Sequence, residues 1–390
     1  MQACSFSRRF VTAVLLPAAS TLLPAGPVSA ADAAARTPLR AIPFQEVQIT
    51  SSFWKPRIET NITGTLAQCL HQCEQTGRLA NFARAGRLQE GPFQGKFFDD
   101  SDVYKVIEGA AYCLAHRRDP KLEARIDGII DWIAAAQQPD GYLNTYFTLV
   151  KPEERWTDLF LMHELYCAGH MFEAAVAYAA ATGKTRLLEV ARRKADHIDA
   201  TFGPGKRFGY SGHEEIELAL VKLGRATGEK RYLDLARWFI DVRGTGPTPG
   251  QGDRDPAYIQ AHKPIRRQDD VVGHAVRAMY LYAGVADVAA LTDDAELLKV
   301  MDSIWNSVVL RKMYVTGGVG SRHGGEAFGE DYELPNDTAY CETCAAIGLV
   351  LWNQRLLLLH GESRFADVVE RAMYNGILSG VSLDGERFFY

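Results

Sequence analysis

The sequence Ala180-Ala181-Thr182-Gly183-Lys184 leads directly into Leu187-Leu188-Glu189-Val190-Ala191, and this succession decides the fold. The same order returns where Ala226-Thr227-Gly228-Glu229-Lys230 precedes Tyr232-Leu233-Asp234-Leu235-Ala236. The flanking segments are rich in Ala, Leu, Glu, Arg and Lys, and their apolar positions recur every three or four residues, which is the helical period. One helix that ends in Thr-Gly and is followed at once by another predicts an antiparallel αα-hairpin.

Weaker copies of this unit occur at 292–298 and 360–365, within a helical pattern that begins at Phe53 and continues to the end of the chain. The turns are unevenly spaced, which argues against a strict solenoid and favours long loops inserted on one face of a closed ring. We therefore predict an all-α fold, an (α/α)6 toroid spanning residues 53–390. An open superhelical scaffold is the alternative.

The first thirty residues are predicted to be a signal peptide. Arg8 and Arg9 precede an apolar stretch from Phe10 to Leu23, and Val28-Ser29-Ala30 offers a small-residue cleavage site. Pro17 and the shortness of the apolar run argue against a membrane span. We expect an exported protein that is periplasmic or extracellular after cleavage.

Residues 31–52 are interpreted as a linker that carries one short N-terminal strand. Apolar and polar residues alternate from Phe44 to Ile49, which is the period of a half-buried strand.

The charge balance excludes one class of partner. The formal net charge is −5, and the loss of Arg8 and Arg9 with the signal peptide would make the mature chain two units more negative. No basic field is available to offset phosphate charge, so nucleic acid is not an expected partner.

The cysteines can be interpreted either as disulfide partners or as free thiols. An exported protein favours disulfides, yet a chain of this size does not require them for stability. Six cysteines lie outside the signal peptide: Cys69, Cys73, Cys113, Cys167, Cys341 and Cys344.

The densest group of chemically active residues lies between Gly317 and Cys344. Its first half is the glycine-rich stretch Gly317-Gly318-Val319-Gly320-Ser321-Arg322-His323-Gly324-Gly325-Glu326, and several carboxylates follow. Glycines permit a close approach of the backbone to a ligand, and a His with several carboxylates among them is not the usual composition of a surface loop. Glu326 is therefore the principal candidate for a general acid and base. A solvated loop glutamate is the alternative.

The segment Cys341-Glu342-Thr343-Cys344 stands at the start of an apolar helix. Its spacing is that of half a zinc site, and a helix N-terminus favours thiolates and carboxylates. A full site needs about four ligands, and no cysteine follows Cys344. A redox or disulfide pair is the alternative.

These motifs together resemble glycoside hydrolase family 127, the β-L-arabinofuranosidases. The resemblance rests on Gly-Glu-Ala-Phe at 325–328, Asp-Tyr-Glu-Leu-Pro-Asn-Asp-Thr at 331–338 and Glu-Thr-Cys at 342–344. It extends from about Phe53 to Tyr390. Further matching motifs lie at 98–105, 138–143, 212–217 and 273–277.

The resemblance implies retaining hydrolysis of terminal β-L-arabinofuranosyl, or related pentosyl, residues of plant-type glycans. Glu326 would be the acid/base, and the nucleophile would be a zinc-bound thiolate. Glu342 and Cys344 would be two of the four zinc ligands, whereas Cys341 is not a ligand in the family's pattern. The other two are an adjacent Cys-Cys pair beyond Tyr390, so we expect an incomplete Zn²⁺ site and little turnover by this chain.

The resemblance also implies that the barrel is incomplete at its C-terminus, where a β-sandwich normally follows and would pair with the strand at 44–49. It places substrate-binding residues at His170, His213 and His274, with Gln68 and Tyr390 also at pocket positions. A histidine satisfied within the core is the alternative for each of the three histidines.

Two rival functions stay open. A non-catalytic carbohydrate-binding scaffold would need the pocket histidines but not Glu326. A thiol-redox or structural-zinc protein would depend on Cys341 and Cys344 together.

Overall fold

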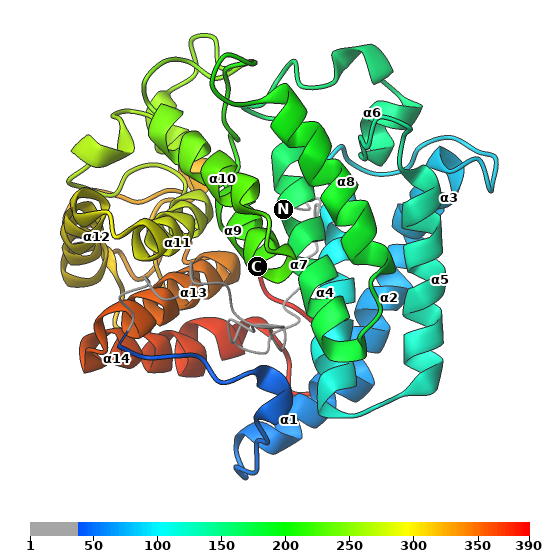
Figure 1. The fold of residues 1–390 in the computed structure, drawn as a ribbon. Coiled ribbons are helices and arrows are strands. Elements are labelled where there is room, and N and C mark those ends of the chain that lie inside the picture. Colours follow the sequence, from blue (N-terminus) through cyan, green and yellow to red (C-terminus); the bar gives the residue numbers. More distant parts are fainter. Residues whose placement is uncertain (1–37) are drawn as a thin grey trace, which may run out of the picture.

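The computed structural model describes residues 38–390, so the predicted signal peptide and the first part of the linker lie outside the described residues. Figure 1 shows helices arranged as a ring, with an inner set surrounded by an outer set. The predicted all-α (α/α) toroid is confirmed. The inner helices are α2 (Leu66–Gln75), α4 (Asp100–His116), α7 (Glu164–Thr182), α9 (Ile216–Thr227), α11 (Ala275–Thr292) and α13 (Thr343–His360).

Each inner helix packs against the next one around the ring, in the order α2, α4, α7, α9, α11, α13. Each is also followed along the chain by an outer helix that packs against it. Six such hairpins result, among the described residues. The outer helices are α3 (Arg78–Ala85), α5 (Pro120–Ala136), α8 (Arg186–Thr201), α10 (Lys230–Val242), α12 (Ala295–Ser307) and α14 (Ser363–Arg371).

The inner helices other than α2 are buried around most of their circumference, whereas α2 and the outer helices are buried along one face only. In α7, for example, all sixteen residues from Glu164 to Ala179 are buried, whereas buried and exposed positions are mixed along α8. A helix that is apolar all round must lie inside the fold, and a one-sided helix must cover it. This difference in pattern sorts the helices into two layers.

Glycines let the inner helices approach closely. A Cβ on Gly284 of α11 would lie 2.8 Å from the Cβ of Glu217 on α9, and one on Gly348 of α13 would lie 2.7 Å from the Cβ of Met279 on α11. Both distances are shorter than real Cβ contacts, so only glycine fits at these crossings.

The two ends of the ring meet through aromatic side chains. α1 (Trp54–Thr60) lies against the π-helical turn Ala372–Ile377, where Trp54 Nε1 donates to the Tyr374 hydroxyl at 3.0 Å. Phe53 packs on the same tyrosine, with ring centroids 5.1 Å apart. The toroid is thereby closed between its first and last helices.

Short helical segments occupy the loops. They are α6 (Thr145–Leu149), the π-helical turns Asn61–Thr65 and Val308–Lys312, and the 3-10 turns Phe44–Glu46, Pro152–Glu154, Pro256–Ile259, Ile265–Arg267, Gly324–Glu326 and Leu378–Gly380.

The predicted strand at Phe44–Ile49 is wrong, because Phe44–Glu46 form a 3-10 turn and only isolated β-bridges occur within residues 38–390. The Phe44 ring packs edge-on against Tyr112 at 5.0 Å, and Gln45 Nε2 donates to the Ala180 carbonyl at 2.9 Å. A strand needs a partner for its backbone groups. Here side-chain contacts with α4 and α7 hold the segment instead.

All six described cysteines are free. Cys69, Cys73, Cys113 and Cys167 are buried among apolar side chains and serve as small core residues. Within the described part of the chain, no helix combines the length and the apolar character needed to cross a bilayer.

Candidate functional site

The inner helices begin at one common end of the toroid, and the candidate site lies there. Phe98 precedes α4 and lies 5.3 Å, between ring centroids, from His163, which caps α7. His163 lies 5.3 Å from His213, and His213 lies 5.7 Å from His274, which caps α11. Because His213 precedes α9, the starts of four helices converge. Free N–H groups and positive dipole ends therefore face this region.

A tight turn presents Glu326 at this end. Arg322 and Ala327 exchange two backbone hydrogen bonds of 3.0 Å, so residues 323–326 form the tip of a small hairpin. Gly325 and Glu326 both have left-handed backbone conformations, with φ of 74° and 52°. A non-glycine residue in that region is uncommon, and such strain collects at functional positions.

The turn is fixed to the helix that carries His274. Ala327 forms a β-bridge with His274, and the Phe328 N–H donates to the Gly273 carbonyl at 2.9 Å. His274 Nε2 then lies 2.8 Å from Glu326 Oε2. Tyr340 donates its hydroxyl to Glu326 Oε1 at 3.2 Å, so both carboxylate oxygens are held.

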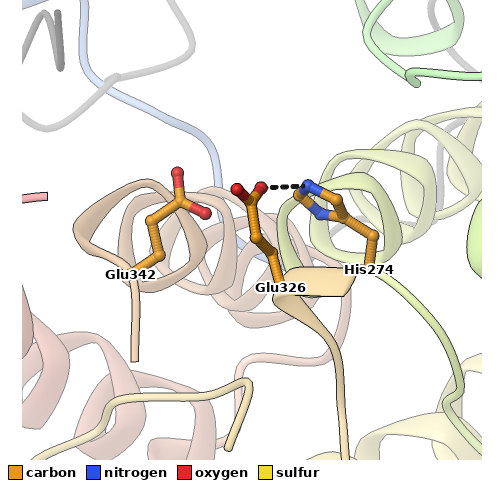
Figure 2. A group of neighbouring side chains, drawn as sticks. All are labelled: His274, Glu326 and Glu342. Carbon is orange, nitrogen blue, oxygen red and sulfur yellow. Dashed lines mark hydrogen bonds and ion pairs between the residues drawn. The ribbon is translucent and has the colours of Figure 1, made fainter. Parts of the chain in front are cut away.

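Glu342 completes the cluster. Figure 2 shows Glu326 between His274 and Glu342, with the two carboxylates directed toward each other. One ligand atom from each of the three residues lies within 4.8 Å of the others. Glu342 is buried and caps α13, where the helix dipole favours a negative charge.

Tyr390 and Cys344 surround the Glu342 carboxylate. The Tyr390 hydroxyl donates to Glu342, and burial together with that negative charge raises the pKa of Tyr390 well above its ordinary value. Burial raises the pKa of the Cys344 thiol, and the neighbouring Glu342 raises it further. A cation between Glu342 and Cys344 would reverse both effects. The residues present therefore fit one half of a zinc site.

The Cys341 side chain does not join the cluster around Glu342. Its Sγ packs against Gly318, where an added Cβ would lie 3.2 Å from the sulfur, and burial raises the pKa of this thiol to about 11. Cys344 instead lies beside Glu342, and both cysteines are free. The structure thus brings Cys344, and not Cys341, to the cluster.

His213 and His274, both predicted pocket residues, lie side by side in the row of rings. Burial lowers the pKa of His213 well below its ordinary value, and the Arg277 charge lowers it further. The imidazole is therefore neutral and able both to donate and to accept.

His170 lies deeper, within α7. Its Nδ1 is 3.3 Å from Glu215 Oε1, and its ring meets Tyr166 edge-on at 4.5 Å. The Tyr166 ring lies between His170 and the row, because it also contacts His213 at 4.2 Å and His163 at 5.5 Å. Its Nε2 is buried without a hydrogen-bond partner, so only one ring nitrogen is satisfied within the core. A direct role for His170 stays a prediction.

His163 was missed by sequence reasoning. It is half-buried, adopts a left-handed φ of 57°, and lies between Phe98 and His213. Burial lowers its pKa to about 3, helped by Arg277, so it is also neutral. The available signal was its position in the sequence: His163 and His274 directly precede their inner helices, and His213 lies three residues before the start of α9.

Gln68 is half-buried on α2, one turn beyond Thr65, which packs against Gly385 of the C-terminal segment. The C-terminal segment continues to Tyr390, which reaches the cluster. Participation of Gln68 itself stays a prediction.

The fold and the site define a helical toroid with a carboxylate and histidine cluster at its mouth, the class that includes many carbohydrate-active enzymes. Within that class, residues 46–390 match the family described as β-L-arabinofuranosidase, GH127 catalytic domain. The chain belongs to this family.

Individual relatives agree. The chain is 42% identical, over 384 residues, to the non-reducing end β-L-arabinofuranosidase of Bifidobacterium longum subsp. longum. That alignment covers 88% of this chain and 58% of the relative.

Two solved structures share the fold. A GH127 β-L-arabinofuranosidase from Geobacillus stearothermophilus T6 has a TM-score of 0.86 at 45% identity, covering 88% of this chain and 58% of the other. A second GH127 β-arabinofuranosidase has a TM-score of 0.85 at 47% identity, covering 91% and 57%. The chain spans less than three fifths of the length of these relatives.

Proposed function

We propose that the protein is a retaining glycoside hydrolase that releases terminal β-L-arabinofuranosyl, or related pentosyl, residues from plant-type glycans. The observation that carries the proposal is the arrangement of Glu326, whose two oxygens are held by His274 and Tyr340 beside the neutral imidazoles of His163 and His213. Family membership and the names of the relatives support the substrate class.

Glu326 has the position of a general acid and base. As an acid it donates a proton to the leaving glycosidic oxygen, and as a base it later takes one from the attacking water. The side chain is only 19% exposed, so a bound sugar would exclude the remaining water.

The histidine row has the chemistry of a sugar-binding wall. Neutral imidazoles at His163 and His213 each have one nitrogen at a backbone carbonyl, of Leu161 and Glu214, and can bond a sugar hydroxyl through the other. His274 lies beside them and orients Glu326 through Nε2. Glu342 and Tyr390 add an acceptor and a hydroxyl at the opposite side of Glu326. We assign recognition of one furanose ring to these five residues.

Glu342 and Cys344 would hold Zn²⁺, which when bound keeps its cysteine ligands deprotonated. The resemblance places two further cysteine ligands beyond Tyr390, outside the 390 residues of this sequence. We expect the 390-residue chain to bind the sugar and to turn it over poorly. Export remains part of the proposal, and N-terminal sequencing of the secreted protein would test cleavage after Ala30.

Calorimetric titration with methyl β-L-arabinofuranoside tests the binding site. We expect saturable binding that His213→Ala weakens at least tenfold. His71→Ala, which alters an exposed histidine on α2, should leave the affinity unchanged. The absence of saturable binding would overturn the proposed function.

Turnover of an aryl β-L-arabinofuranoside, measured with zinc and reductant, tests the chemistry. We expect little or no product from the chain as given, and any residual turnover should be lost in Glu326→Gln. Activity that is robust and survives Cys344→Ser would contradict the thiolate and zinc account. If Glu326→Gln changes neither sugar binding nor any residual turnover, a non-catalytic carbohydrate-binding scaffold is the better description.

A further inference from the structure

The proposed function leaves two features of the Glu326 turn without a role, the His323 side chain and the aromatic ring of Tyr340. His323 is exposed at the tip of the turn. Its ring meets the Tyr340 ring edge-to-face, with centroids 5.2 Å apart and planes at 89°. Tyr340 is the same residue whose hydroxyl binds Glu326. The two rings therefore form a corner next to the proposed proton donor.

The turn has open space next to His323. A Cβ added to Gly324, the residue after His323, would meet no atom within 4 Å. Arg322, which precedes His323 in the chain, is already engaged, because it binds both carboxylate oxygens of Glu333, at 2.8 and 2.5 Å. An uncharged group with an apolar face is thus the best match for this surface.

The direction of the reaction places the leaving group here. A general acid must lie within hydrogen-bond reach of the oxygen that it protonates, and that oxygen belongs to the leaving group. The inner side of Glu326 faces His274 and the histidine row, which takes the terminal sugar. The group beyond the scissile bond then extends past Glu326 toward His323 and Tyr340.

We infer that His323 and Tyr340 form a subsite for the second sugar ring of the substrate, the ring that leaves. The C–H face of that sugar would pack on the aromatic corner, and its hydroxyl groups would reach the His323 imidazole. This inference rests on the proposed function and adds a preference for substrates with a sugar on the reducing side.

Two ligands separate the subsite from the terminal-sugar site. One is methyl β-L-arabinofuranoside, which has a single ring, and the other is a disaccharide in which β-L-arabinofuranose is linked to a second arabinose. Affinities for both are measured by calorimetric or NMR titration of the 390-residue chain. We expect His323→Ala to weaken disaccharide binding about two- to tenfold, the range of a ring contact, and to change monosaccharide binding less than twofold.

Tyr340 provides an internal control, because its ring and its hydroxyl have different partners. Tyr340→Phe keeps the ring and removes the bond to Glu326, so the ratio of the two affinities should stay near that of the wild type. Tyr340→Ala removes both and should lower the disaccharide advantage. His71→Ala is the matched control for loss of an exposed histidine and should change neither affinity.

The outcomes are distinguishable. Binding of neither ligand overturns the proposed function and, with it, the subsite. Binding of both ligands with an affinity ratio unchanged in His323→Ala overturns the subsite alone. Since His323 is exposed, that variant is expected to fold even if Tyr340→Ala does not.

Discussion

His274 and Glu326 are joined twice, once through a 2.8 Å contact between Nε2 and Oε2 and once through a β-bridge between His274 and Ala327. The backbone bridge sets the position of the carboxylate, and the imidazole sets its orientation. Residues distant in the sequence are thereby held as one rigid unit at the mouth of the toroid.

His274→Ala should weaken the binding of methyl β-L-arabinofuranoside by about tenfold or more, since it removes a sugar contact and releases the Glu326 carboxylate. Loss of the partner should also lower the free energy of unfolding by about 1–3 kcal/mol. His274→Gln, whose amide can still donate, should recover part of both losses. Equal affinity in all three proteins, measured by calorimetry, would show that His274 does not act on the sugar or through Glu326.

Zinc binding should depend on Glu342 and Cys344. We expect Glu342→Gln and Cys344→Ser each to lower zinc affinity at least tenfold in titrations followed by elemental analysis. Cys341→Ser, the matched thiol control, should bind zinc as the wild type does. A loss in Cys341→Ser, or a loss in His274→Ala with none in Cys344→Ser, would place the metal elsewhere, in the second case among His274, Glu326 and Glu342.

Buried Lys194 should make the stability depend on pH. Its Nζ lies 3.8 Å from the centroid of the Tyr142 ring and 4.5 Å from that of Trp156. Burial lowers the pKa of Lys194 to about 7, against the opposing effect of Glu164. Between about pH 7 and pH 10 the unfolded chain therefore binds more protons than the folded one, so the stability contributed by this site rises with pH.

Glu164 acts in the opposite direction at lower pH. Burial raises its pKa from 4.5 to about 7, so the folded state binds more protons than the unfolded state in that interval and stability falls as pH rises. Urea unfolding of wild type and Lys194→Met at pH 7, 8, 9 and 10 isolates the lysine. The difference in the free energy of unfolding between these two proteins should change by about 1 kcal/mol per pH unit near pH 8. Lys230→Met, at an exposed lysine, should give parallel curves; parallel curves for Lys194→Met would contradict the assignment.

The close crossing of α9 and α11 should be intolerant of a single methyl group. Gly284→Ala places a Cβ against Glu217 and the Leu218 backbone, and we expect a loss of about 1–3 kcal/mol in the free energy of unfolding. Gly128→Ala, on the outer helix α5 with no atom within 4 Å of the new Cβ, should instead gain about 0.5–1 kcal/mol. The midpoint temperature of thermal unfolding should fall in Gly284→Ala and rise in Gly128→Ala. Equal shifts in the two variants would be inconsistent with helix packing as the cause.

The sequence predicted the hairpins because helical period and turn chemistry are local. The Thr-Gly turns at Gly183 and Gly228 do end inner helices, and the left-handed φ of each glycine explains its presence. The same reasoning was wrong for Phe44–Ile49, because an alternation of apolar and polar residues does not show whether a partner strand exists.

The site was only partly predictable for a related reason. Glu326 and Glu342 belong to motifs dense enough to stand out, and the structure brings them together. His163 and His170 are both histidines of one segment, and sequence could not show that the first faces the row whereas the second faces Glu215. That distinction depends on which part of α7 reaches the mouth of the ring.

The hydrogen bond from Tyr390 to Glu342 has a consequence for the order of folding. Each hairpin joins neighbours in the chain and can form from local contacts, which is the fast part of folding. The site draws on segments from His163 to Tyr390, so its final hydrogen bonds must wait until almost the whole ring is in place. During synthesis most of the helical ring would therefore fold before the hydrogen bonds of the site can form.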